Sequence, residues 1–234
     1  MSKISNATLG REWDPPVRRL KLSWVAVLAF GSPLFIPLYP LILASLGTHY
    51  VGDALTQYSL AFSLTLPAVF AGRFVASRIS QTPLTIFIIE VALSICALLI
   101  APILYLSLSV PSLTQFLIIL VHPIPGVLLG MESLLFGRIM ERLTLYLSGA
   151  FSGAILACSF LVPYADHFRI LGFISLLHAF AALSLTFAFP FTPPCLRLGL
   201  RTLSVLAILF SFIAVYFADS FFLGLETTLF PIRK

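Results

Sequence analysis

Charged side chains are scarce in this sequence. Only 10% of its 234 residues are Asp, Glu, Lys or Arg, while 59% are apolar. A soluble domain carries about 25% charged residues, so this chain lacks the polar groups that would cover a water-soluble surface. The mean hydropathy of +1.06 points the same way. The composition therefore excludes a soluble enzyme domain.

Cysteine and soluble active-site motifs are lacking as well. Cys96, Cys158 and Cys195 form no CxxC or CxxCH pattern, which argues against a zinc site, a c-type haem or a disulfide framework. There is no GxGxxG, P-loop, GxSxG or HExxH sequence. The longest polar stretch, residues 1–23, is too short for a folded domain. We therefore expect no catalytic activity, and no nucleic-acid partner, from this chain.

Long apolar runs dominate what is present. They are Trp24–Leu46, Leu55–Ala76, Ile86–Leu108, Leu113–Phe136, Leu143–Val162, Ile170–Phe189 and Leu203–Leu223. Each is near the roughly 20 residues that cross a bilayer as a helix, and a helix satisfies its own backbone groups in lipid. The sequence predicts an all-α integral membrane protein, with a tail at 1–23 and one bundle of about seven transmembrane helices at 24–234.

Basic residues gather on one side of this layout. Eleven of them lie in the tail and in or next to alternate loops: Lys3, Arg11, Arg18, Arg19, Lys21, Arg73, Arg78, Arg138, Arg142, Arg197 and Arg201. The opposite loops hold one, Arg169. Cytoplasmic loops carry the excess of Lys and Arg, so we expect a cytoplasmic N-terminus, an external C-terminus and a location in the bacterial inner membrane.

Two acidic residues lie deep within apolar runs. Glu90 lies in the middle of the third run and Glu132 in the inner half of the fourth. A charge at the bilayer centre costs on the order of 3 kcal/mol, so each acid must face the bundle interior, be protonated or find a partner. Together the two carboxylates predict a cation or proton site. The alternative is that each acid is hydrogen-bonded to a neighbouring helix and serves only to join helices.

Histidines provide the other candidate ligands. His122 and His178 lie in apolar runs and are the candidates for haem or chlorophyll ligation, although a hydrogen bond to another helix is the commoner role. The spacing of His49 with Asp53, and of Asp166 with His167, permits metal binding but is common in loops. We predict no metal and no cofactor; a bound lipid is compatible with the bundle.

Small residues and prolines mark the helix contacts. Ser148, Gly149, Ser152 and Gly153 form two small-xxx-small pairs, which allow helices to approach closely in lipid. Prolines at 33, 37, 40, 123 and 125 punctuate the first and fourth runs, and kink a helix or open it onto a cavity.

Several motifs resemble the membrane domain of spermidine-synthase-like proteins, a major-facilitator-like region fused to an aminopropyltransferase. The similar positions are Tyr50, Gly52, Gln57, Gly72, Ser77 and Arg78, then Glu90, then the Gly130–Met131–Glu132 triplet, then Tyr146, Gly149, Ala150 and Gly153 to Pro163. Departures occur at Leu145, where the family has an acid, and at Ile79, where it has a second arginine. The resemblance covers residues 50–234 and implies a membrane module without its catalytic domain, which would follow Lys234.

Three functions fit these expectations. The first, which we favour on the sequence, is a non-catalytic accessory or scaffolding subunit whose partners are other integral membrane subunits and the lipid bilayer. The second is a transporter-like or polyamine-binding module that uses Glu90 and Glu132. The third is the membrane half of a split aminopropyltransferase.

Overall fold

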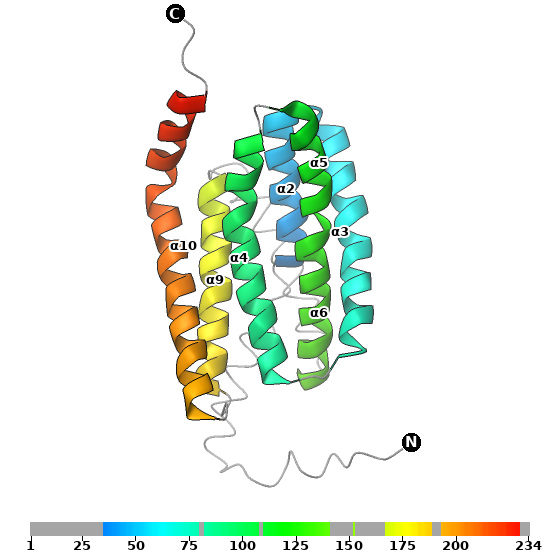
Figure 1. Ribbon diagram of the computed structural model, residues 1–234. Coiled ribbons are helices and arrows are strands. Elements are labelled where there is room, and N and C mark those ends of the chain that lie inside the picture. Colours follow the sequence, from blue (N-terminus) through cyan, green and yellow to red (C-terminus); the bar gives the residue numbers. More distant parts are fainter. Residues whose placement is uncertain are drawn as a thin grey trace, which may run out of the picture.

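The computed structural model describes residues 35–79, 82–107, 110–140, 152, 167–188 and 193–229, and their regular structure is helical throughout. The helices are α2 (Phe35–Val51), α3 (Ala54–Ala76), α4 (Pro83–Ser107), α5 (Pro111–Val121), α6 (Pro123–Met140), α9 (His167–Ala188) and α10 (Pro194–Leu229). They run side by side along one axis, with α10 at one edge of the bundle and α3 near the other (Figure 1).

Five helical segments are long and apolar enough to cross a membrane. They are Ala54–Ala76, Pro83–Ser107, Ser112–Leu135, His167–Phe187 and Pro194–Phe217. α2 is a shorter apolar helix, and it contains the described part of the first predicted span. Of the fifth predicted span, Leu143–Val162, only Ser152 lies within the described residues. The chain is thus a multi-pass helical bundle, and the structure supports five of the seven predicted crossings.

Prolines lie both within helices and at their first positions. α2 runs through Pro37 and Pro40 without ending. The fourth predicted span does break, at His122, where α5 ends just before Pro123 opens α6. A proline is tolerated at the first position of a helix, where its missing N–H is not needed.

Helix α10 corrects one prediction. It begins at Pro194 and has 36 residues, about 54 Å at 1.5 Å per residue, whereas the sequence predicts a span at Leu203–Leu223. Arg197 and Arg201, expected in the preceding loop, therefore lie in its first turns. The guanidinium of Arg201 lies 4.2 Å from the ring centroid of Phe187. Long basic side chains can keep their charge near the membrane surface from such positions.

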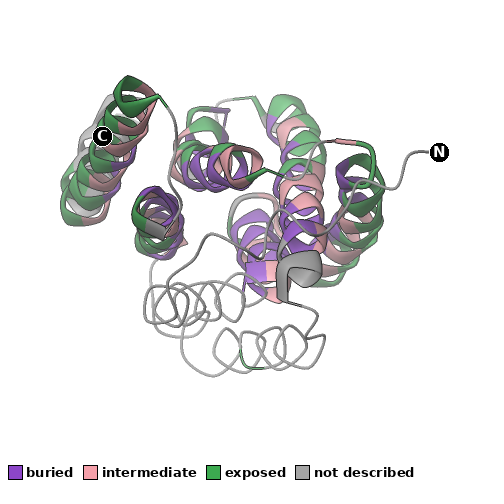
Figure 2. Ribbon diagram, turned by 90° about the horizontal axis from the view of Figure 1, so that it is seen from below, coloured by how far each residue is buried: buried purple, intermediate pink, exposed green. Residues whose placement is uncertain are grey.

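The bundle buries polar residues together with its apolar core, and it exposes many large apolar side chains. Phe70 and Phe210 are more than half exposed, while Ser94, Thr65 and Glu132 are buried. Figure 2 shows buried residues along the contacts of the central helices and exposed residues on the outer faces, α10 above all. This arrangement suits a lipid surround and indicates an integral membrane protein.

The tightest helix contact joins α3 and α6. Gly72 faces the backbone of Val127, and Gly130 faces the backbone of Val69, so each helix presents a glycine to its partner. Gly126, one turn before Gly130, packs on Ala68. Helix association in lipid depends on such close packing because lipid is as apolar as the side chains. The Gly126-x3-Gly130 spacing is the sequence signal for this contact, and it lies outside the predicted helix-packing residues Ser148, Gly149, Ser152 and Gly153.

Of the four small residues predicted to mediate a helix contact, only one can be located. Ser148, Gly149 and Gly153 lie outside the described residues, and Ser152 is an exposed helical residue.

Candidate functional site

Four helices place polar side chains at one point inside the bundle. α4 packs mainly on α9 and also on α6, while α2 contacts α6 and α9. On α4 the buried positions Phe87, Glu90, Ser94 and Ala97 recur at helical spacing, and Ile95 faces outward. Glu90 therefore faces the interior because it shares one side of the helix with the packing residues.

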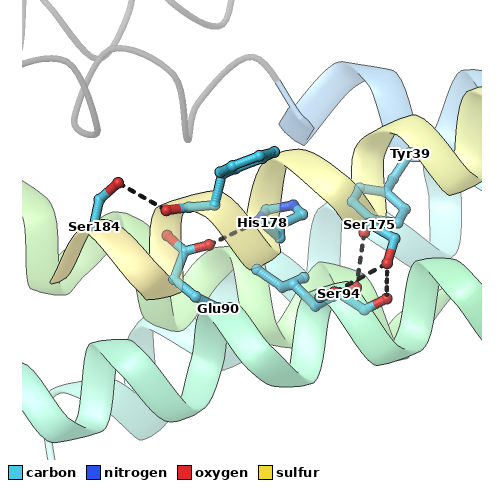
Figure 3. A network of polar contacts seen from close by, with 8 residues as sticks. Tyr39, Glu90, Ser94, Ser175, His178 and Ser184 are labelled. Atoms are coloured by element: carbon cyan, nitrogen blue, oxygen red, sulfur yellow. Dashed lines mark hydrogen bonds and ion pairs between the residues drawn. The ribbon is translucent and has the colours of Figure 1, made fainter. Parts of the chain in front are cut away.

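Glu90 and His178 form the centre of the site. The Nδ1 atom of His178, on α9, lies 2.7 Å from Oε2 of Glu90, and both residues are only 1% exposed. Figure 3 shows the two side chains pointing toward each other across the contact between α4 and α9. A charged hydrogen bond of this length is strong in a medium of low dielectric constant.

Glu132 completes the cluster from α6. Its carboxyl group interacts with that of Glu90 and, electrostatically, with His178. It is 0% exposed. A hydrogen bond between two carboxyl groups needs a proton on one of them, because an ionised carboxylate only accepts. We call Glu90, Glu132 and His178 the carboxyl–imidazole cluster.

Aromatic residues of α2 enclose the imidazole. The ring of Phe35 lies 4.4 Å from that of His178 between centroids, and the ring of Tyr39 lies 6.3 Å away. The hydroxyl of Tyr39 donates to the carbonyl oxygen of Leu93 at 3.3 Å. The imidazole is thus held between α2 and α4, and its orientation is fixed by packing as well as by Glu90.

A separate set of hydroxyls joins α4, α9 and α10. The Oγ atom of Ser175 lies 2.9 Å from that of Ser94 and 2.7 Å from that of Ser211, and it also hydrogen-bonds to the carbonyl of Ser94 at 2.7 Å. This serine chain lies beside the cluster on the same helix contact (Figure 3). It satisfies its own donors and links three helices without any ionisable group.

His122 occupies a different environment. It is buried where α5 meets α6, and its Nδ1 atom contacts the carbonyl oxygen of Ile118. Its Nε2 atom, like that of His178, has no hydrogen-bond partner among the described residues. Neither histidine suits haem or chlorophyll in this conformation, because each is 1% exposed and a macrocycle needs an open face beside the ligand.

The residues around Asp53 have structural roles at one end of the bundle, and both nearby histidines, His49 in α2 and His167 in α9, lie in helices and not in the loops where the sequence predicts them. Asp53 accepts hydrogen bonds from the backbone N–H and hydroxyl of Thr56 and so caps α3. These bonds lower the pKa of the Asp53 carboxyl below its ordinary value. His167 lies in the first turn of α9, 2.6 Å from Oγ of Ser45, and its ring stacks near that of His49 at 6.1 Å.

The described residues give no support for a metal site. Asp166 lies outside the described residues. Within the described ranges no three His, Cys, Asp or Glu side chains are arranged to hold a metal ion, and this includes the carboxyl–imidazole cluster.

The structure thus brings together Glu90, Glu132 and His178, and it separates them from His122, His49 and His167. Comparison with protein-family models, curated proteins and solved structures finds no match to the chain. The resemblance to the membrane domain of spermidine-synthase-like proteins therefore stays a prediction.

Proposed function

We propose that the chain is a transporter-like integral membrane module that loads and unloads a proton at the carboxyl–imidazole cluster. One observation carries this proposal: two carboxyl groups and an imidazole from three different helices meet, fully buried, in the interior of an apolar bundle. Buried acids inside membrane proteins are costly and commonly mark proton or ion pathways.

Joining helices is a weaker explanation of the cluster. The serine chain of Ser94, Ser175 and Ser211 already links α4, α9 and α10 with neutral hydroxyls. A pair of carboxyl groups joins helices only while it holds a proton, since two ionised carboxylates repel each other. A group whose attraction depends on a proton is better suited to a cycle than to permanent packing.

The size of the site favours a proton over a larger cation. Glu90, Glu132 and His178 are 0–1% exposed, so a polyamine would need the bundle to open before it could bind. A proton needs no such space. Because the cluster does not form a metal-binding group, a metal ion is also disfavoured. A polyamine remains a candidate cargo only on the strength of the sequence resemblance.

Helix packing supports a cycle of this kind. α3 is held to α6 by glycine contacts, and α4 is held to α9 and α10. Glu132 belongs to the first group and Glu90 to the second. The cluster therefore spans the contact between two groups of tightly packed helices, where gain or loss of a proton changes the attraction between them.

We further propose that the end of the bundle that carries Arg73 and Arg78 faces the cytoplasm of a bacterial inner membrane. Arg197 and Arg201, in the first turns of α10, lie at this same end (Figure 1), and an excess of basic residues is typical of cytoplasmic loops. In a background without native cysteines, a membrane-impermeant thiol reagent should label Val110→Cys in intact cells. It should label Arg78→Cys only after permeabilisation. The reverse pattern would overturn this orientation.

Infrared spectroscopy tests proton binding by the cluster. We expect the purified protein near neutral pH to show a protonated-carboxyl band, because the exposed acids are ionised there and one cluster acid holds a proton. Glu132→Gln should remove or shift this band. Ser133→Ala, which changes a buried neighbour on α6 that hydrogen-bonds only to its own helix, should leave the band in place. A wild-type spectrum with no such band would refute the proposal.

The accessory-subunit function, which the sequence favours, stays a prediction. The geometry gives it less support, since nothing in the described residues identifies a partner, whereas the cluster offers a defined chemistry.

A further inference from the structure

We propose that His178 relays the proton that the carboxyl pair takes up and releases. The Nε2 atom of the imidazole exchanges this proton with a water molecule. This inference rests on the proposed function and names the atom by which protons reach the cluster. It assigns different roles to the two nitrogens of one ring.

The two ring nitrogens have different surroundings. Nδ1 lies 2.7 Å from Glu90, whereas Nε2 is buried and has no hydrogen-bond partner among the described residues. A buried polar atom without a hydrogen-bond partner destabilises the folded state. Ordered water is the usual partner of such an atom. The unpaired Nε2 atom therefore points to a small polar ligand on the side of the ring away from Glu90.

The other ionisable groups near the ring do not take this place. From α2, Tyr39 uses its hydroxyl on the carbonyl of Leu93. From α6, Glu132 reaches the carboxyl of Glu90. From α4, Glu90 itself bonds to Nδ1. The Nδ1 atom of the imidazole is thus bonded to the carboxyl pair, whereas Nε2 is available to exchange a proton.

The relay moves one proton without any other chemistry. In the starting state Nδ1–H donates to the Glu90 carboxylate and Nε2 holds a lone pair. A hydronium ion gives a proton to Nε2 and leaves a water molecule, and the ring becomes an imidazolium. The Nδ1 proton then passes to Oε2 of Glu90, which leaves a neutral carboxylic acid and an imidazole protonated at Nε2. Release runs through the same steps in reverse.

Packing of the ring decides which of its nitrogens exchanges a proton with water. Phe35 and Tyr39 lie against the ring, so the imidazole is not free to turn over and present Nδ1 to water. Uptake and release both pass through Nε2, and the side of the membrane that supplies water to Nε2 decides where the proton goes. If the water route to Nε2 closed on one side of the membrane and opened on the other, the cluster would exchange protons with the two sides in turn.

The His178→Asn substitution separates the roles of the two nitrogens. The asparagine amide lies near the position of Nδ1 and can still donate to Glu90, but it has no group at the position of Nε2. The measurement is the rate at which the protonated-carboxyl infrared band shifts after transfer of the protein to heavy water.

We expect His178→Asn to keep the carboxyl band and to slow its exchange by about 100-fold, the scale of a lost proton-transfer group. His178→Ala should be slow as well, and added imidazole should restore its rate. Ser175→Ala, which disrupts the serine chain on the same helix without touching the cluster, should exchange as the wild type does.

The outcomes separate the relay from the function on which it rests. Wild-type exchange in His178→Asn, with the band intact, overturns the relay and leaves proton binding by the carboxyl pair in place. Absence of the band from the wild type overturns both. If His178→Asn does not fold, the comparison of His178→Ala with and without imidazole decides, and failure of imidazole to accelerate exchange counts against the relay.

Discussion

Gly130→Ala is expected to lower the free energy of unfolding by about 3 kcal/mol, the upper part of the range for overpacking a filled interior. A Cβ atom at Gly130 would overlap the carbonyl oxygen of Val69 and lie 2.8 Å from its carbonyl carbon. Because these are backbone atoms, no side-chain rotation can make room. α3 and α6 must move apart, and the packing that joins them in lipid is lost.

Thermal unfolding in mild detergent measures this effect. Gly199→Ala is the matched control, since Gly199 is also within a helix but has nothing within 4 Å of the position of a new Cβ. That change should leave stability unaltered or raise it by up to about 1 kcal/mol, because alanine favours a helix more than glycine does. Equal melting of the two variants would contradict the close approach of α3 and α6.

Gly130→Ala should also disturb the carboxyl–imidazole cluster. Glu132 lies on α6 only two residues after Gly130, so a shift of α6 away from α3 changes its distance from Glu90. The glycine contact thus holds one of the two carboxyl groups in place. A helix contact that looks purely structural is in this way connected to the chemistry of the interior.

Much of the fold could be predicted from hydropathy. Five of the predicted spans coincide with helices long and apolar enough to cross a membrane, because a run of about 20 apolar residues has few alternatives in lipid. The start of α10 was predicted too late, since Arg197 and Arg201 lower the local hydropathy. Pro194 at the first helical position was the signal that pointed to the earlier start.

The candidate site was predicted in part. Glu90 and Glu132 stand out because acids are rare in apolar runs. Their contact could not be derived, since it depends on which helices are neighbours and how each is rotated. The sequence groups His178 with His122 as a candidate ligand, apart from the two acids. Comparing the depth of polar residues along the predicted spans would have placed it near both acids, although its hydrogen bond to Glu90 needs the structure.

Loss of proton flux in two glutamine variants is the second large effect that we expect. Glu90→Gln and Glu132→Gln each keep the size and most hydrogen bonds of the side chain but cannot bind or release a proton. If the cluster only joins helices, these variants should behave as the wild type. If it carries a proton, they should assemble normally and lose transport, because a glutamine cannot take part in the exchange between Glu90, Glu132 and His178.

The most direct test of the account is proton movement across liposomes that contain the purified chain and a trapped pH-sensitive dye. With a pH gradient imposed, we predict dye responses in wild-type liposomes, and rates lower by about tenfold or more for Glu90→Gln and for Glu132→Gln. Ser133→Ala should match the wild type. Equal rates for wild type and both glutamine variants, at equal reconstitution, would contradict proton loading by the cluster.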